Sequence, residues 1–263
     1  MDIQGKIAVV TGGARGIGRG IAAALARAGA DVAIGDRLDD PGIASAAAET
    51  IKVVEEAGRR AVAVRCDVTS QADCDALMQS AVTQLGGLHI VCANAGVQST
   101  LPVVELELAE WERVLRVNAT GTFLTCKAAL PHLLAQKQGS IVNMASITGL
   151  RGAANMAHYS ASKFAVVGFT EALAAEVARG GVRVNCICPD GVRSDMTLGL
   201  LKHHTGIQDD AKADALWTRV SAERAPLGLS VEPSHIGDAV VYLCQADTLT
   251  GVALPVTAGA HLP

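Results

Sequence analysis

The segment from Lys6 to Ala30 constrains the fold more than any other part of the chain. A short apolar run, KIAVV, leads into the glycine-rich turn TGGARGIG and then into an alanine-rich stretch that predicts a helix ending near Gly29. Glycines at positions 12, 16 and 18 let the backbone turn sharply and approach a pyrophosphate, which binds well at the positive N-terminus of a helix. Strand, turn and helix in this order predict a dinucleotide-binding unit.

The second apolar run, DVAIGD, ends at Asp36. In a dinucleotide-binding unit an acid at this point contacts the ribose hydroxyls of the cofactor. A 2′-phosphate there would meet the carboxylate at about 4 Å, which costs roughly 4 kcal/mol at an effective dielectric constant near 20. The expected cofactor is therefore NAD. Arg15 and Arg37 leave NADP open, because a guanidinium beside the ribose can accommodate a phosphate.

Apolar runs alternate with helical segments along the whole chain. This alternation predicts one α/β domain over residues 1–263, a Rossmann-type doubly wound parallel sheet of seven strands with helices on both faces. Residues 194–229 break the alternation, and we expect them to form a mobile lid that selects the substrate. The expected strands are KIAVV, DVAIGD, AVAVRCD, HIVCANAG, SIVNMAS, RVNCICP and a last strand near VALPVT.

A tyrosine and a lysine four residues apart, Tyr159 and Lys163, indicate proton-transfer chemistry. On a helix these positions share one face, so the ammonium can lie beneath the ring and, together with a cationic cofactor ring, favour the phenolate. Ser146 ends an apolar run upstream and could hold a substrate oxygen. Taken alone, such a pair is more often a packed tyrosine and a solvated lysine.

Together these strings resemble the compact, single-domain form of the short-chain dehydrogenase/reductase family, over nearly the whole chain. TGGARGIG is similar to its glycine motif, Asn94 to Gly96 to its NAG motif, and YSASK to its YxxxK motif. The resemblance implies a catalytic set of Asn118, Ser146, Tyr159 and Lys163. It also implies cofactor contacts from Gly12, Arg15, Gly16, Ile17, Gly18, Asp36, Arg37, Asp67, Val68, Asn94, Ala95, Gly96, Tyr159, Lys163, Pro189, Gly191, Val192 and Ser194.

The activity that the resemblance implies is hydride transfer between NAD and a secondary alcohol or ketone. Tyr159 would serve as general acid or base, Ser146 would bind the substrate oxygen, and Lys163 would lower the tyrosine pKa and bind the nicotinamide ribose. Asn118 would hold a water that links the lysine to solvent, although a purely structural role in bending its helix is an alternative. Relatives of this form assemble as tetramers, so a homo-oligomer is expected.

Three departures from the family pattern stand out. Asp190 separates Pro189 from Gly191 where the family has an adjacent pair, so a carboxylate either stands near the active site or points to solvent and shapes a turn. The connection over residues 37–58 is longer than usual, and its early part is either a short insertion beside the adenosine or an exposed loop leading into an amphipathic helix. The C-terminal segment is short before Thr250, which leaves subunit contacts open.

Composition narrows the partners. The net charge is only −4 with no basic stripe, so neither nucleic acid nor an anionic membrane is expected. No apolar stretch approaches the roughly 20 residues of a membrane helix, and the first residues lack a signal peptide's basic region, so a cytoplasmic location is expected. Seven cysteines, an odd number, predict reduced thiols. Cys186 and Cys188 lack further ligands nearby, and no metal site is expected.

Side chains expected near the pocket are small, apolar or amide, and they favour a neutral alcohol, polyol or cyclic ketone of modest size: Gln98, Thr148, Ala153, Asn155, Met156 and Met196. His158, His203 and His204 could touch the substrate, but packing or solvent exposure is more common for such residues. Alternative functions are an NADP-dependent carbonyl reductase and a non-catalytic NAD-binding regulator. A nucleotide-sugar epimerase is disfavoured because Arg15 stands where its glycine pattern needs glycine.

Overall fold

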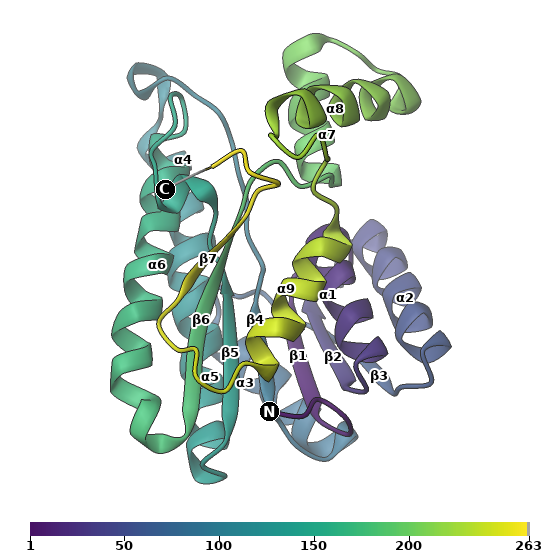
Figure 1. The fold of residues 1–263 in the computed structure, drawn as a ribbon, viewed down its shortest axis with the longest axis vertical. Coiled ribbons are helices and arrows are strands. Elements are labelled where there is room, and N and C mark those ends of the chain that lie inside the picture. The colour runs from purple at the N-terminus through teal and green to yellow at the C-terminus, as the bar shows by residue number, and fades with distance from the viewer. Residues whose placement is uncertain (262–263) are drawn as a thin grey trace.

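The computed structural model describes residues 1–261 and contains one seven-stranded parallel sheet (Figure 1). The strands lie in the order β3-β2-β1-β4-β5-β6-β7, and every pairing is parallel. The predicted doubly wound sheet is confirmed. Its strands are β1 (Ile7–Thr11), β2 (Asp31–Asp36), β3 (Ala61–Arg65), β4 (Ile90–Ala93), β5 (Gly139–Met144), β6 (Val182–Pro189) and β7 (Ala253–Val256).

Helices cover both faces of the sheet. One face carries α1 (Gly16–Arg27), α2 (Pro41–Glu56) and α9 (Pro233–Gln245), and the other carries α3 (Gln71–Ser80), α4 (Leu108–Leu115), α5 (Gly121–Ala135) and α6 (Ala157–Val177). Five shorter turns complete this part: η1 (Ala81–Leu85), η2 (Val103–Glu105), η3 (Arg116–Thr120), η4 (Ile147–Gly149) and η5 (Ala178–Gly180). Residues 37–40 are only a short turn before α2, which Asp40 caps, so the loop-and-helix alternative is correct for this stretch.

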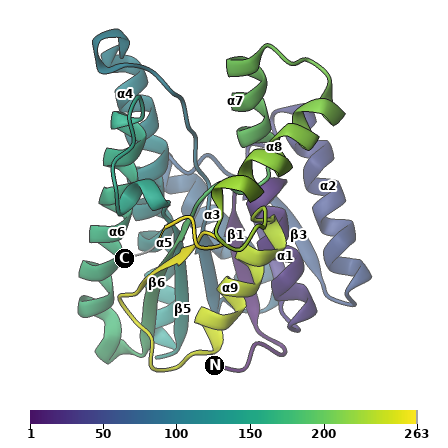
Figure 2. The ribbon, with the colours of Figure 1, turned by 45° about the horizontal axis from the view of Figure 1, so that its top comes forward.

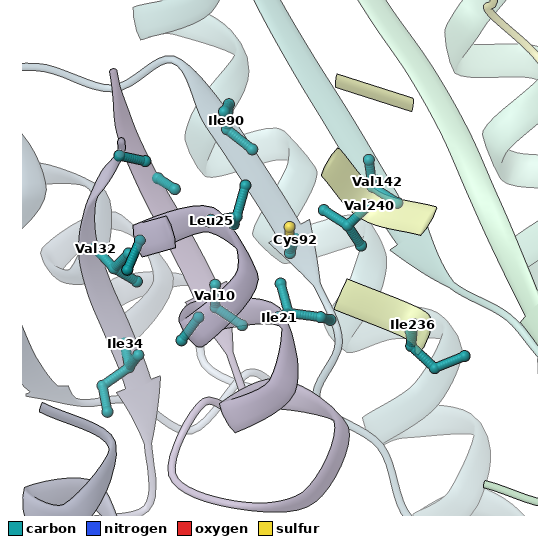
Figure 3. Close-up of a cluster of buried hydrophobic side chains, with 14 of the residues drawn as sticks. Val10, Ile21, Leu25, Val32, Ile34, Ile90, Cys92, Val142, Ile236 and Val240 are labelled. Atoms are coloured by element: carbon teal, nitrogen blue, oxygen red, sulfur yellow. The ribbon is translucent and has the colours of Figure 1, made fainter. Parts of the chain in front are cut away.

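The two faces have separate hydrophobic cores because strand side chains alternate. Val10 and Ile34 pack with Ile21 and Leu25 of α1, whereas Val9 belongs to the core beneath α3, α5 and α6. Figure 3 shows the first core, where Ile236 and Val240 of α9 meet α1. Their close approach needs glycine, since a Cβ on Gly20 would lie 2.4 Å from the carbonyl oxygen of Pro233.

A buried carboxylate at the start of β2 joins this strand to the loop before β3. Asp31 is 5% exposed and forms ion pairs with Arg59 and Arg60 at 2.8 and 2.7 Å. Burial raises the pKa of this carboxyl, but the hydrogen bonds from Arg60 and the charge of both arginines outweigh it, so the pKa lies below its ordinary value.

The order in which successive strands join the sheet reverses at β1, which lies between β2 and β4. At such a switch point the loops after the two neighbouring strands run apart, which leaves a crevice at the carboxyl ends of the strands. The segment after β6 rises over this edge as α7 (Asp195–Thr205) and α8 (Asp210–Arg224), as Figure 2 shows from a second side. The predicted glycine turn and catalytic residues therefore share one edge of the sheet with α7 and α8.

Among residues 1–261, every helix is too short or too polar to cross a bilayer.

Candidate active site

The glycine turn between β1 and α1 is closely packed against the strand next to it. Gly12 and Gly16 have φ of 63° and 54°, in the left-handed region that favours glycine. A Cβ on Gly12 would lie 2.9 Å from Cα of Ala95, and a Cβ on Gly18 would lie 2.0 Å from the carbonyl oxygen of Gly12. A side chain at Gly12 or Gly18 would therefore push the turn away from β4 or force it open.

Asn94 ties the end of β4 to this turn. Its amide nitrogen donates to the carbonyl oxygens of Thr11 and Gly12 at 2.9 and 3.2 Å. The Thr11 hydroxyl in turn accepts from the backbone N–H groups of Asn94 and Ala95. This role of Thr11 was not anticipated, because nothing in the local sequence shows that β4 lies beside β1.

Asp36 lies at the end of β2 beside the turn. One carboxylate oxygen accepts from the backbone N–H of Ala14 at 3.0 Å, and the other accepts from that of Arg37 at 2.9 Å. The Arg37 side chain is exposed, and the Arg15 guanidinium lies 3.5 Å from the Asp195 carboxylate of α7. The carboxylate is thus fixed at the place where an adenosine ribose is expected, with one arginine nearby that is open to solvent.

Asp67 and Val68 lie just beyond β3, on the same edge of the sheet. The Asp67 carboxylate accepts hydrogen bonds from the backbone N–H and hydroxyl of Thr69 at 2.9 and 2.8 Å. Val68 is 7% exposed and packs against Gly121, where a Cβ would lie 2.7 Å from its side chain. The loop after β3 is therefore fixed in position by its own side chains.

Ser146, Tyr159 and Lys163 come together where β5 ends and α6 begins. The Ser146 oxygen accepts from the N–H of Thr148 at 3.2 Å and from its hydroxyl at 3.1 Å, so its own proton is left for another acceptor. Lys163 is 4% exposed, donates to the carbonyl oxygen of Met144 at 2.7 Å, and lies 5.6 Å from the centre of the Tyr159 ring. The predicted helical pair is formed as expected.

Burial acts on the ionisation of both members of this pair. It lowers the pKa of Lys163 to about 8, against a smaller opposing influence from Cys188 and Cys186. It raises the pKa of Tyr159 to about 12, although the Ser146 hydroxyl acts in the opposite direction. The buried lysine by itself therefore does not bring the tyrosine pKa toward neutrality.

Asn118 lies in the π-helical turn η3, which joins α4 to α5. Its amide clasps the backbone of Val97, accepting from the N–H at 2.8 Å and donating to the carbonyl oxygen at 2.9 Å. It also donates to the Ser162 hydroxyl, which donates to the carbonyl oxygen of Tyr159 at 2.7 Å. Asn118 thus has structural contacts at this π-helical turn, and Ser162 is a further link to α6 that the sequence did not reveal.

The loop after β6 brings the remaining predicted residues to the same edge. Pro189 ends the strand, Gly191 has a φ of 56°, and Val192 forms an isolated bridge with Val231. Ser194 caps α7 and accepts from the N–H of Thr197. These contacts fix the start of α7 beside the glycine turn.

The sequence left open whether Asp190 points to solvent or lies near the active site. In the structure its side chain does not point to solvent. Its side chain is 19% exposed, and its carboxylate lies 3.7 Å from the Arg224 guanidinium at the end of α8. A small cavity of about 20 Å³ lies between Asp190, Ser221 and Thr257. The carboxylate is turned toward α8 and the C-terminal segment, because these elements pack against the loop after β6.

The residues of the turn fit a dinucleotide. Glycine at positions 12, 16 and 18 keeps the backbone of the turn bare of side chains. The first turn of α1 holds no acidic side chain and no side-chain cap, so its N–H groups are available to phosphate oxygens. Gly16 and Ser194 both line a hollow of about 350 Å³ beside α1. Ile17 packs against the core from the first turn of α1, and Gly96 lies close to both Asn118 and Lys163.

Comparison with known proteins agrees with this geometry. The family model described as short chain dehydrogenase matches residues 6–204. Cis-4-hydroxycyclohexanecarboxylate dehydrogenase of Sinomonas cyclohexanicum is 37% identical over 97% of this chain and 96% of its own length. A 3-alpha-(or 20-beta)-hydroxysteroid dehydrogenase of Mycobacterium tuberculosis is 37% identical over 93% of this chain and 84% of its own length. The crystal structure of an actinorhodin polyketide ketoreductase variant with NADPH superposes with a TM-score of 0.87 at 35% identity, covering 97% of each chain.

Proposed function

Because the chain belongs to the short-chain dehydrogenase/reductase family and is thus an oxidoreductase of alcohols, we propose that it transfers a hydride between NAD and a secondary alcohol or ketone. The observation that carries this proposal is the convergence of Ser146, Tyr159 and Lys163 at the edge of the sheet that also holds the glycine turn. Lys163 lies 5.6 Å from the centre of the Tyr159 ring, and the Ser146 hydroxyl has a proton free to donate.

In the oxidation direction Tyr159 takes the proton of the substrate hydroxyl, which is held by Ser146. Burial disfavours each charge alone, but a phenolate and an ammonium formed together stabilise one another in a medium of low dielectric constant. When bound, NAD⁺ supplies the hydride acceptor and a positive ring charge that further favours the phenolate. In the reduction direction Tyr159 returns the proton to the carbonyl oxygen.

Asp36 supports NAD as the cofactor. Its carboxylate is held by the N–H groups of Ala14 and Arg37, so it cannot easily turn away from a 2′-phosphate. The exposed Arg37 supports the second candidate, an NADP-dependent carbonyl reductase, because its guanidinium could reach a phosphate. The polyketide ketoreductase solved with NADPH shows that a protein of this fold can take that cofactor.

We extend the proposal to the rest of the molecule. Residues 1–263 act as one domain in which residues 194–229 form the lid. Asn118 relays protons from Lys163. The location is cytoplasmic, and the seven free and buried cysteines support this. Exposed Phe123 on α5 and Phe164 on α6, at 41% and 48%, support a homotetramer with contacts through these helices. Light scattering coupled to gel filtration tests the assembly.

The reaction is tested by following NADH absorbance across a panel of cyclic alcohols, polyols and ketones, with NAD and with NADP. Cyclic alcohols come first because two relatives are named for a hydroxycyclohexanecarboxylate and a hydroxysteroid. We expect turnover with NAD of at least one secondary alcohol, at a higher kcat/KM than with NADP. A higher kcat/KM with NADP would favour the carbonyl reductase instead, and no turnover with either cofactor would count against both.

A further inference from the structure

Four polar side chains from three parts of the fold meet beside Tyr159 without belonging to the catalytic set. His158 of α6 is fully buried, and its Nε2 lies 2.7 Å from the hydroxyl oxygen of Ser99, in the loop after β4. The Ser99 hydroxyl also bonds the carboxylate of Glu110 in α4. Arg113 closes the set with two hydrogen bonds to the same carboxylate, at 2.6 and 2.8 Å.

The protons in this hydrogen-bond network have only one consistent arrangement. The Arg113 guanidinium is the main cause that lowers the pKa of Glu110 to about 2, so the carboxylate is ionised and can only accept. Ser99 must therefore give its single proton to Glu110, and its oxygen accepts the Nε2–H of His158. In an activated serine nucleophile the proton runs from serine to histidine. Here it runs the other way, so the set orients Ser99 and does not activate it.

The hydrogen-bond network fixes the loop of residues 97–101, which starts at the catalytic centre. A Cβ on Gly96 would lie 3.2 Å from Oδ1 of Asn118 and 3.6 Å from Nζ of Lys163, so the next residues leave directly from that site. Val97 is clasped by Asn118, and the N–H of Leu101 donates to the carbonyl oxygen of Asn155 at 2.8 Å.

Ser99 lies midway between these two backbone anchors, and within residues 1–261 only its side chain forms hydrogen bonds. Asn155 is itself in the left-handed region, with a φ of 61°, which asparagine adopts more readily than most residues other than glycine. The loop is thus held at residues 97, 99 and 101, while Gln98 and Thr100 between them are left for other contacts.

We propose that His158, Ser99 and Glu110 are positioning residues that hold residues 97–101 against the start of α6 and thereby fix the substrate-binding side of this loop opposite Tyr159. The proposal rests on the dehydrogenase function proposed above. It assigns His158 a role distinct from packing, namely to hold Ser99 through Nε2. Within residues 1–261 the other ring nitrogen, Nδ1, has no hydrogen-bond partner. The single bond from Nε2 to Ser99 is therefore what ties the ring to the loop.

Two substitutions at His158 separate positioning from packing. His158→Gln places an amide N–H about where Nε2–H lies, whereas His158→Asn places it about where Nδ1 lies, out of reach of Ser99. We expect His158→Gln to keep the substrate KM within about threefold of the wild type. His158→Asn and Ser99→Ala should both raise the KM about tenfold with kcat changed less than about threefold, the effect of one lost hydrogen bond. The dissociation constant of NADH should stay unchanged in all three variants.

Hydrogen exchange by mass spectrometry provides a readout that needs no substrate. Amides of residues 97–101 should exchange faster in Ser99→Ala and His158→Asn than in the wild type and His158→Gln, while those of β5 keep their protection. Equal KM values for the Gln and Asn variants, or unchanged exchange of residues 97–101 in Ser99→Ala, would overturn the proposal. A wild type that turns over no alcohol or ketone would instead sink the proposed function, and the exchange result would still decide on the loop.

Discussion

Asp36 offers a quantitative test of cofactor choice. Asp36→Asn removes the negative charge but keeps the size of the side chain and one oxygen that can accept from the N–H of Ala14 or Arg37. We expect it to shift the preference from NAD toward NADP, since the carboxylate would otherwise repel a 2′-phosphate.

The magnitude follows from the geometry at the end of β2. Two unit charges at about 4 Å repel by roughly 4 kcal/mol at an effective dielectric constant near 20. Asp36 is partly exposed, so screening by solvent and salt reduces this to about 2 kcal/mol. The ratio of kcat/KM for NAD to that for NADP should therefore fall about 30-fold in Asp36→Asn.

Initial rates with both cofactors at low and high ionic strength provide the assay. The shift should come mainly from a lower KM for NADP and should shrink at high salt. Asp39→Asn is a matched control, because it removes the same charge three residues further along, from a carboxylate that is 63% exposed and lies near Arg65. An unchanged cofactor ratio in Asp36→Asn, or an equal shift in Asp39→Asn, would refute the assigned ribose contact.

Three further predictions concern the turn, the fold and the substrate oxygen. Gly18→Ala should abolish NADH binding in a fluorescence titration, because its methyl group would lie 2.0 Å from a carbonyl oxygen of the turn, whereas Gly199→Ala, which meets no atom within 4 Å, should bind normally. Asp31→Asn should lower the free energy of unfolding in urea by about 2 kcal/mol at neutral pH. Because the pKa of Asp31 lies below 3.8 in the folded protein, this stabilisation is present above about pH 4 and is lost as the pH falls further, so an equal difference at pH 7 and near pH 3 would contradict it. Ser146→Ala should lower kcat about a hundredfold with the KM for NAD unchanged, and a small loss would show that another group holds the substrate oxygen.

The features that the sequence predicted correctly depend on residues that are close together along the chain. Apolar runs, a glycine turn and alternating helices depend on neighbouring residues, so the strands and the turn at Gly12 could be inferred from the order of residues alone. The pair of Tyr159 and Lys163 is equally local, because one helical turn joins the two. The predicted sheet is confirmed in strand number and arrangement.

The parts that sequence reasoning missed depend on elements far apart in the chain. Ser99 meets His158 only because strand pairing places β4 beside β5, which brings the loop after β4 and α4 against the start of α6. Asp190 faces Arg224 because α8 returns over the loop after β6. The tyrosine pKa, raised to about 12, depends on burial that no spacing of residues reports.

Turnover of Tyr159→Phe tests the proposed reaction most directly. The substitution removes only the hydroxyl that would carry the proton, and the ring that packs above Lys163 remains. We predict that NADH formation from a substrate of the wild type falls at least about a hundredfold, while the dissociation constant of NADH stays within about twofold. Undiminished turnover in a variant that still binds NADH would contradict the assignment of Tyr159 as the proton-transfer group.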